Sequence, residues 1–306
     1  MVSAVSEMSV INGLELLSSR QQHSSSNGVL HAEKLRQVWK VSNRGEFHQP
    51  VLYQPYGIAW CGSGIAVAEG FWPYSRIQTF DEHSGKSRST SEQGIILPFD
   101  VAVANHMDGF IAVTDHHDRT VKILSSSTHD IISSWPAGAF RWPTGISCDQ
   151  RGRFYVVDWS SGLATVCDAS GQTISQFSTT CTSKFSRPVF VAVDSHRRIV
   201  ISDAFCHVVR IFDEVGSLLG VAGSDAGKGK LADPRGVCVG PGGNLIVADW
   251  ANNAVKEYSP DGEWIQDLLD SEAGVQNPWG VAMNDNGALA ISEQKLSGTP
   301  ALKLFV

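Results

Sequence analysis

Flat aromatic rings and arginine side chains gather at two fixed positions of a motif that recurs six times along the chain. The motif begins with a proline and a short apolar run, and it ends with a second apolar run and a carboxylate. The rings and arginines lie near these prolines or carboxylates: Tyr56, Phe71, Trp72, Tyr74, Phe99, His116, His117, Trp142, Trp159, Phe205, Trp250 and Trp279, with Arg141, Arg187 and Arg235. Rings stack on the flat groups of a ligand and guanidinium groups pair with phosphate or carboxylate, so this set has the chemistry of a ligand-binding surface.

The repeat of the whole motif places these side chains. Its six copies run from Pro55 to Glu69, from Pro98 to Asp115, from Pro143 to Asp158, from Pro188 to Asp203, from Pro234 to Asp249 and from Pro278 to Glu293. Successive prolines are 43 to 46 residues apart. A period of this length indicates an architecture built from repeated supersecondary units.

Each unit has the composition of four short β-strands. In the fifth unit, apolar and β-branched runs at 236–239, 245–249, 254–258 and 264–269 are separated by loops and tight turns. Short runs of this kind, bounded by turn residues, are typical of strands. Six units of four antiparallel strands predict a β-propeller, in which each blade buries its faces against its neighbours.

The two ends of the chain predict how the ring closes. The sixth unit stops at residues 301–306, which align with a third strand, and a lone strand-like run at 35–41 precedes the first unit. A fourth strand would pair with the backbone N–H and C=O groups that a three-stranded last blade leaves exposed at its edge. We therefore expect the N-terminal run to complete the last blade. The sequence thus predicts an all-β, six-bladed propeller over residues 34–306, preceded by a disordered or loosely attached segment over residues 1–33.

The composition is that of a globular protein with a substantial core. Hydrophobic residues make up 42% and charged residues 18% of the chain, and no apolar stretch reaches the roughly 20 residues of a membrane-spanning helix. The first residues lack the basic region of a secretory signal, and the cysteines, at positions 61, 148, 167, 181, 206 and 238, form no Cys-x-x-Cys pair. We therefore expect buried free thiols and a monomeric cytoplasmic protein without a membrane partner.

Two stretches carry a family resemblance. They are Pro143-Thr-Gly-Ile-Ser-Cys-Asp-Gln-Arg-Gly-Arg-Phe-Tyr-Val-Val-Asp158 and Asp203-Ala-Phe-Cys-His-Val-Val-Arg-Ile-Phe-Asp213, which resemble NHL repeats. A six-fold set over residues 34–306 is similar to the C-terminal propeller of TRIM-NHL proteins. The resemblance implies a domain that binds RNA or protein partners. Because no RING, B-box or coiled-coil segment precedes the repeats, ubiquitin-ligase chemistry is not expected within this chain.

Two positions depart from the family pattern. The Asn-x-Arg that often follows the family's Asp is degenerate, with Arg119, Gly162, His207 and Asn253 in units two to five. The Gly that follows Pro by two positions is replaced by Asp100 in unit two and by Phe190 in unit four. Neither change is explained by the sequence.

The connections between strands divide into two sets. In an up-and-down meander alternate connections emerge at opposite ends, so the loops before each Pro and after each carboxylate should share one face, which we call the first face. The remaining turns, such as 61–64, 240–244 and 284–287, share the opposite face and contain residues suited to tight turns but no aromatic residue. The first face is therefore the predicted binding surface.

Single-stranded or hairpin RNA fits the chemistry of the first face best. Bases stack on aromatic rings for about 1–3 kcal/mol each, and arginine neutralises phosphate or forks onto base edges. The candidate RNA- or ligand-binding residues are Arg141, Arg187, Arg235, Tyr56, Trp72, Phe99, His116, His117, Trp142, Trp159, Phe205, Trp250 and Trp279. Because the formal net charge is -7, this hypothesis requires a local basic patch on an acidic body.

Other interpretations of the same residues remain open. The first face is also suited to a peptide or protein, which would make the domain a scaffold of TRIM-NHL type that recruits partners or ubiquitin-ligase substrates. Trp159 and Trp250 occupy equivalent positions after the carboxylate and are equally suited to wedge between adjacent blades.

Catalysis is not expected. Propellers of similar fold that act as hydrolases or lyases hold metals through His or carboxylates at the central channel, but no histidine flanks the six prolines. The sequence also contains no Gly-x-Ser-x-Gly motif and no glycine-rich phosphate loop. The six carboxylates at strand ends are expected to accept backbone N–H bonds. We predict no catalytic residue, metal site or cofactor, with a metal-dependent hydrolase or lyase as the remote alternative.

Overall fold

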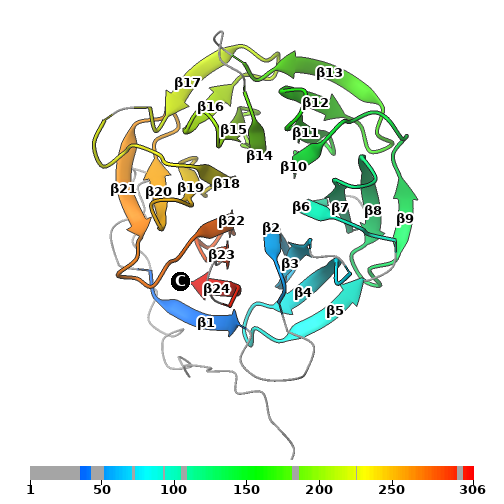
Figure 1. The fold of residues 1–306 in the computed structure, drawn as a ribbon, viewed down its shortest axis with the longest axis horizontal. Coiled ribbons are helices and arrows are strands. Elements are labelled where there is room, and N and C mark those ends of the chain that lie inside the picture. The colour runs from blue at the N-terminus through cyan, green and yellow to red at the C-terminus, as the bar shows by residue number, and fades with distance from the viewer. Residues whose placement is uncertain are drawn as a thin grey trace, which may run out of the picture.

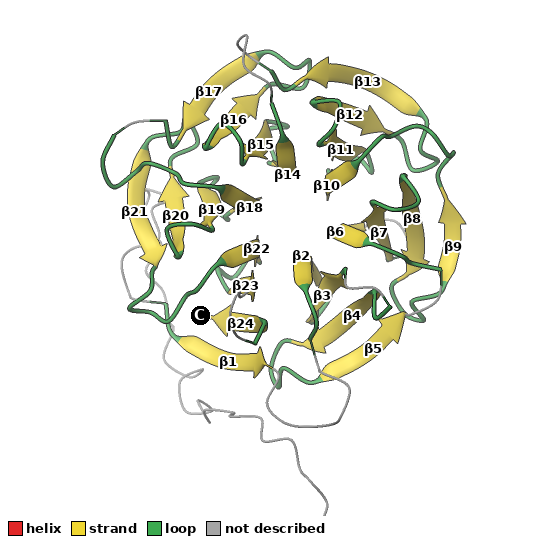
Figure 2. Ribbon diagram, viewed as in Figure 1, coloured by secondary structure: helices red, strands yellow, loops and turns green. Residues whose placement is uncertain are grey.

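The computed structural model shows a ring of six four-stranded antiparallel sheets (Figure 1). It describes residues 35–42, 52–70, 73–91, 94–104, 109–180, 186–224, 226–294 and 299–306. Figure 2 shows strands and loops throughout this part of the chain, which confirms the predicted all-β propeller. The N-terminal segment 1–33 and the proposed boundary at 34 lie outside the described residues. Within them, no helix has the length and apolar character needed to cross a membrane.

Each blade is a meander whose four strands follow one another from the channel to the rim. Blades one to three consist of β2 (Pro55–Cys61), β3 (Gly64–Glu69), β4 (Arg76–Asp81) and β5 (Ser87–Ser91); β6 (Pro98–Ala104), β7 (Phe110–Asp115), β8 (Thr120–Ser125) and β9 (Ile131–Ser134); and β10 (Pro143–Cys148), β11 (Phe154–Asp158), β12 (Leu163–Cys167) and β13 (Thr173–Ser178). Blades four and five consist of β14 (Pro188–Val193), β15 (Ile199–Asp203), β16 (Val208–Phe212) and β17 (Leu218–Ala222); and β18 (Pro234–Val239), β19 (Leu245–Asp249), β20 (Ala254–Tyr258) and β21 (Trp264–Leu269). Blade six consists of β22 (Pro278–Met283), β23 (Leu289–Glu293), β24 (Ala301–Phe305) and the N-terminal β1 (Gln37–Ser42).

The ring closes as the sequence predicts. Strand β1 lies outside β24 and pairs with it antiparallel, with Val41 opposite Leu302 (Figure 1). Trp39 is buried and packs with Phe80 of blade one. Its Nε1 donates a hydrogen bond to the carbonyl of Glu82 at 2.6 Å. The closing strand therefore joins blade six to blade one as well as completing a sheet.

The core lies between the blades. The second strand of every blade is buried along its whole length apart from Phe110, because apolar side chains cover both of its faces. The outer strands β9 and β13 are largely exposed. Burial is thus greatest in the middle of each blade and lowest at the rim, as expected for blades packed face to face around an axis.

Close approach of the inner strands explains the glycine that lies two positions after the proline in four of the six blades. A Cβ on Gly57 would lie 1.9 Å from Oδ1 of Asp100, and a Cβ on Gly145 would lie 2.5 Å from the Cα of Phe190. Asp100 and Phe190 are the two residues that replace this glycine in blades two and four. The missing side chain of the preceding glycine leaves room for the carboxylate of Asp100 in blade two and for the backbone at Phe190 in blade four.

Removal of the closing strand should destabilise the whole ring. We expect deletion of residues 34–42 to lower the melting temperature sharply, and Trp39→Ala alone to lower the free energy of unfolding by about 3–5 kcal/mol, because it empties a buried site. Lys40→Ala is the matched control, since successive residues of a strand face opposite sides. Urea unfolding that leaves Trp39→Ala as stable as Lys40→Ala would contradict closure by β1.

Candidate functional site

A buried carboxylate at the end of each second strand holds the loops of the first face. In blade three, Oδ2 of Asp158 accepts hydrogen bonds from the backbone N–H groups of Arg141 and Trp142 at 2.6 and 2.8 Å. Its Oδ1 accepts hydrogen bonds from the N–H groups of Ser160 and Ser161 at 3.0 and 2.9 Å. One carboxylate therefore fixes the loop before the proline and the loop after the strand, which confirms that the two loops share a face.

In the other five blades the carboxylate also accepts hydrogen bonds from backbone N–H groups of these loops, from both loops in blade two, where His117 and Asp118 also donate, and from one loop in each of the other four. The backbone N–H groups that donate to the carboxylates belong to Tyr53 for Glu69, Ile96 and Leu97 for Asp115, Phe205 and Cys206 for Asp203, Ala232 for Asp249, and Gln276 for Glu293. All six carboxylates are buried. Their expected structural role is thus visible in every blade, and the described residues contain no cluster of His, Cys, Asp or Glu arranged to hold a metal ion.

A basic residue on the third strand pairs with the carboxylate in four blades. The pairs are Arg76 with Glu69 at 3.1 Å, Lys122 with Asp115 at 2.7 Å, Arg210 with Asp203 at 2.6 Å and Lys303 with Glu293 at 2.6 Å. In blade five, Lys256 instead pairs with Asp267 at 2.8 Å. Burial then raises the pKa of Asp249 to about 6. Sequence analysis missed these pairs, although a basic residue in the third strand of each of these units was visible in the sequence.

The degenerate position four residues after the carboxylate has a backbone requirement. Arg119, Gly162, His207 and Asn253 all adopt positive φ, between 52° and 68°. Gly and Asn adopt a positive φ more readily than most residues do, but other residues whose side chains do not branch at Cβ can also adopt it. Two of these residues also join neighbouring blades, because His207 accepts a hydrogen bond from the N–H of Asp233, and Asn253 from that of Asn277.

Rings and guanidinium groups form a continuous series around the mouth of the channel on the first face. The series starts in blade four, where the guanidinium of Arg187 lies over the ring of Phe205 at 5.1 Å and over that of Trp159 at 4.4 Å. Trp159 stacks on Trp142 with ring centroids 4.9 Å apart. Trp142 in turn contacts His116 at 4.9 Å. Burial lowers the pKa of His116, so its ring is a neutral flat surface at neutral pH.

The series continues through blades two, one, six and five. Phe99 lies 6.3 Å from His116 and stacks on Tyr56 at 5.2 Å. Trp279 contacts the edge of Tyr56 at 5.4 Å. The guanidinium of Arg235 lies 4.3 Å from the centre of the Trp279 ring and 5.9 Å from that of Trp250. We call these ten residues, from Phe205 to Trp250, the aromatic–arginine arc.

The structure thus brings together most of the predicted site residues. Within the arc, Phe205 is 54% and Trp142 39% exposed, whereas the other members are half-buried. Trp159 and Trp250 had two predicted roles, as binding residues of the first face or as wedges between blades. They fit both, since they pack between loops and still reach the surface. Arg141 is exposed beside Trp142, and its guanidinium has no hydrogen-bond or ion-pair partner among the described residues.

One predicted residue that the structure describes, His117, stands apart from the arc. His117 is exposed and its Nδ1 lies 3.2 Å from a carboxylate oxygen of Asp118. Trp72 lies outside the described residues, as does Phe71. Tyr74 stacks on Tyr53 at 4.5 Å and forms a separate aromatic pair in blade one.

The channel mouth is occupied by side chains. Phe99 of blade two contacts Phe190 of blade four at 5.5 Å and Trp279 of blade six at 6.3 Å, so its ring reaches across the axis. Beside it, both carboxylate oxygens of Asp100 accept backbone hydrogen bonds, from Val101 and Ile146 at 2.9 Å each. Burial raises the pKa of Asp100. The described inner end of the site therefore presents rings from three blades.

Basic residues predominate on one side of the first face. In the first-face loops of blades two to five and the start of β18, the described basic residues are Arg119, Arg141, Arg187, Lys228, Lys230 and Arg235, and the described acidic residues are Asp118 and Asp233. The loop into blade six carries Asp270 and Glu272. A local basic excess is thus present on a chain whose formal net charge is -7.

Comparison with known proteins agrees with the fold and the repeats. The NHL repeat family matches residues 231–258, which include β18, β19 and β20. The E3 ubiquitin-protein ligase TRIM32 of Mus musculus is 25% identical over 213 residues, which is 64% of this chain and 31% of that protein. TRIM32 of Homo sapiens is 25% identical over 210 residues, or 62% of this chain and 31% of that protein. The matches thus span about a third of the length of these relatives, and the chain is an NHL-type propeller that resembles those of TRIM-NHL proteins.

Solved structures share the propeller fold at low sequence identity. A streptogramin B lyase has a TM-score of 0.63 at 14% identity and covers 88% of this chain and 98% of its own. A chain of a nidogen/laminin complex has a TM-score of 0.61 at 18% identity, covering 74% of this chain and 84% of its own. A protein of unknown function from Bacteroides thetaiotaomicron has a TM-score of 0.66 at 14% identity, covering 86% and 72%. At these identities the likeness concerns the fold alone.

The unpaired carboxylate of blade five should make stability depend on pH. The pKa of Asp249 is raised from 3.8 to about 6 in the folded chain, so its contribution to stability is fully present below about pH 4 and is lost as pH rises through 6. We expect the wild type to lose at most about 3 kcal/mol relative to Asp249→Asn across this range. Urea unfolding of both proteins between pH 4 and pH 7 measures the difference.

Asp213→Asn is a control of opposite sign. Backbone hydrogen bonds from Ser217 and Val215 lower the pKa of Asp213, so its contribution to stability is lost as pH falls. A pH-independent difference between the wild type and Asp249→Asn would contradict the raised pKa of Asp249.

Proposed function

We propose that the chain is a non-catalytic binding domain that recognises single-stranded or hairpin RNA on the first face and acts in post-transcriptional regulation. The observation that carries this proposal is the aromatic–arginine arc. Rings offer stacking surfaces to bases of any sequence, and guanidinium groups offer bidentate hydrogen bonds to phosphates and base edges.

Charge supports RNA as the ligand. The exposed guanidinium of Arg141 lies next to Trp142, the more exposed of the two stacked tryptophans, so a phosphate and a base could be bound side by side. Eight of the ten arc residues belong to blades two to five, where the described basic residues of the first face exceed the acidic ones. A surface of this kind attracts a polyanion even on an acidic protein.

The packing of the channel mouth supports a binding role over catalysis. The rings of Phe99, Phe190 and Trp279 fill the position at which a propeller enzyme would admit its substrate. The carboxylate of Asp100 uses both oxygens to bind backbone N–H groups. We therefore propose no catalytic role for the described channel residues.

A protein or peptide ligand is the second candidate. The resemblance to TRIM32 favours it, because a propeller in a ubiquitin ligase is suited to recruit substrates or partners. Salt distinguishes the two ligands: affinity for RNA falls steeply with ionic strength through counterion release, whereas binding to a mainly apolar groove responds weakly.

We also propose a cytoplasmic location. Cys61, Cys148, Cys167, Cys206 and Cys238 are free thiols, as expected, and such thiols are typical of a reducing compartment. Burial is less complete than the sequence analysis predicts, because only Cys167 is fully buried. Cys181 lies outside the described residues.

Substitutions at the exposed part of the arc should abolish or weaken RNA binding without unfolding the protein. We expect Trp142→Ala to cost about 1–3 kcal/mol of binding free energy through the loss of one stacked base. Arg141→Glu should weaken binding further and reduce the dependence of affinity on salt, because it removes a phosphate contact. Fluorescence anisotropy with randomised RNA at two salt concentrations measures both effects.

Arg151→Glu is the matched control for charge. Arg151 is exposed in the turn between β10 and β11, on the opposite face of the same blade. RNA affinity that falls equally for Arg141→Glu and Arg151→Glu, or for neither, would contradict binding at the arc.

A further inference from the structure

Among the rings and guanidinium groups that the structure describes, no recorded contact joins the two ends of the aromatic–arginine arc. Phe205 and Arg187 end the series in blade four, and Trp250 and Arg235 end it in blade five. The loop between β17 and β18 lies at the junction of these blades (Figure 1). Three residues of this loop, Gly227, Lys228 and Lys230, together with Ala232, Asn252, Lys256 and Asp267, line a pocket of about 420 Å³. We call residues 227–230 the lysine loop.

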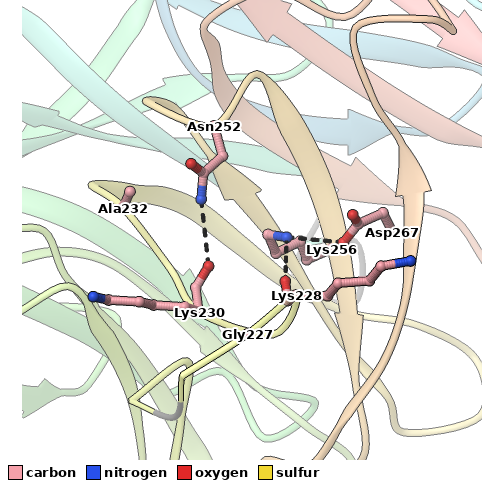
Figure 3. Close-up of a pocket in the computed structure, with 7 residues that line it drawn as sticks. All are labelled: Gly227, Lys228, Lys230, Ala232, Asn252, Lys256 and Asp267. Atoms are coloured by element: carbon pink, nitrogen blue, oxygen red, sulfur yellow. Dashed lines mark hydrogen bonds and ion pairs between the residues drawn. The ribbon is translucent and has the colours of Figure 1, made fainter.

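Side chains of blade five hold the carbonyl groups of the lysine loop. Lys256 donates from Nζ to the carbonyl of Lys228 at 2.7 Å, and Tyr258 donates from its hydroxyl to the carbonyl of Gly229 at 2.6 Å. Asn252 donates from Nδ2 to the carbonyl of Lys230 at 3.3 Å. Three successive carbonyls of the loop therefore accept hydrogen bonds from side chains of blade five. Figure 3 shows the contacts of Lys228 and Lys230.

The lysine loop also carries N–H donors and positive charges that have no partner among the described residues. The backbone N–H groups of Lys228 and Gly229 have no hydrogen-bond acceptor among the described residues. The side chains of Lys228 and Lys230 are exposed and extend in opposite directions from the loop (Figure 3). Neither ammonium group has an ion-pair partner within the described part of the chain. Donors without acceptors, flanked by two cations, form a surface suited to an anion.

In blade five, the lysine of the third strand pairs with Asp267 and not with the carboxylate at the end of the second strand. Lys256 corresponds to Lys122 and Lys303, which pair with the carboxylates of their blades. Because Lys256 pairs with Asp267 instead, it lies at the wall of the pocket, and the carboxylate of Asp249 is held by Ala232 and Asn252. Lys122 and Lys303 also donate to a carbonyl of the loop before their blade, those of Gly94 and Gly274, so this contact belongs to the repeat. What distinguishes blade five is the hydrogen bond from the hydroxyl of Tyr258 and the two exposed lysines in the loop itself.

The two glycines of the lysine loop are required by its shape. Gly227 has a φ of 111°, which side-chain-bearing residues rarely adopt. A Cβ on Gly229 would lie 2.6 Å from the Cβ of Trp264, so the backbone packs directly against the outer strand β21. Any residue larger than glycine at 229 must lift the loop away from the blade.

We propose that the lysine loop is a phosphate-binding element over which the sugar–phosphate backbone of the bound RNA crosses the gap in the arc. This inference rests on the proposed function. Backbone N–H groups and the ammonium groups of Lys228 and Lys230 hold phosphate groups on the two sides of the loop, while Trp250 and Phe205 remain free to stack on bases at either end. Such contacts carry no sequence information and fix the path of the strand.

Removal of the two charges tests the element. RNA binding by Lys228→Gln with Lys230→Gln is measured by anisotropy over a series of salt concentrations. We expect weaker binding, and a plot of log affinity against log salt concentration whose slope is smaller by about 1.4, because each phosphate contact on a single strand contributes about 0.7. The matched control is Lys86→Gln with Arg151→Gln, which removes the same charge from exposed residues of the opposite face.

Gly229→Ala tests the shape of the loop at constant charge. A lifted loop no longer presents its N–H groups, so we expect weaker RNA binding with an unchanged melting temperature of the propeller. As a probe for phosphate alone, inorganic pyrophosphate should shift the NMR amide signals of Lys228 and Gly229 in the wild type but not in the double lysine variant.

The outcomes separate this inference from the proposed function. RNA affinity and salt slope that are the same in the wild type and in the double lysine variant would overturn the lysine loop and leave the arc in place. An equal loss in the opposite-face control would also overturn it, since the effect would then come from overall charge. Absence of RNA binding by the wild type would overturn the proposed function itself, and this inference with it.

Discussion

A buried carboxylate at the end of the second strand of each blade determines the form of the first face. Each carboxylate accepts a hydrogen bond from the loop that precedes its blade, through backbone N–H groups or, for Asp203, through the hydroxyl of Ser186. In blades two, three and four it also accepts backbone N–H bonds from the loop that follows the strand, so that Asp158 binds four N–H groups. An ionised acceptor in a buried site makes strong hydrogen bonds but is costly to leave unsatisfied. The loops are therefore held in one conformation, and the rings that they carry can stack on one another instead of dispersing into solvent.

The same hydrogen bonds allow aromatic and arginine side chains to be concentrated on one face of a protein whose net charge is negative. The turns of the opposite face need only residues that favour tight turns. The loops of the first face are held by the buried carboxylates and can expose tryptophan, phenylalanine and arginine. Arg187 lies between two rings of different blades, and so does Arg235. These contacts orient the guanidinium groups before a ligand arrives, which lowers the entropy lost on binding.

The fold could be predicted from the sequence because it depends on a period and on strand patterns, which are local properties. The proline spacing predicts the six blades, and the lone strand at 35–41 predicts the closure by β1. The site was predictable as a set of loops but not as a series of contacts, because Phe99 meets Phe190 and Trp279 across the axis from distant parts of the chain. The lysine loop was missed because its anion-binding character comes from three carbonyl contacts to blade five, and no sequence motif records them.

Photo-crosslinking of a randomised RNA that contains 4-thiouridine, followed by mass spectrometry of the crosslinked peptides, tests most directly whether RNA lies on the aromatic–arginine arc. The account predicts crosslinks to peptides that contain Trp142, Trp159, Phe205 or Trp250, which are first-face rings close to Arg141, Arg187 or Arg235. Crosslinks confined to the outer strands β9 and β13 or to the turns of the opposite face would contradict it, as would the absence of crosslinks to the folded protein.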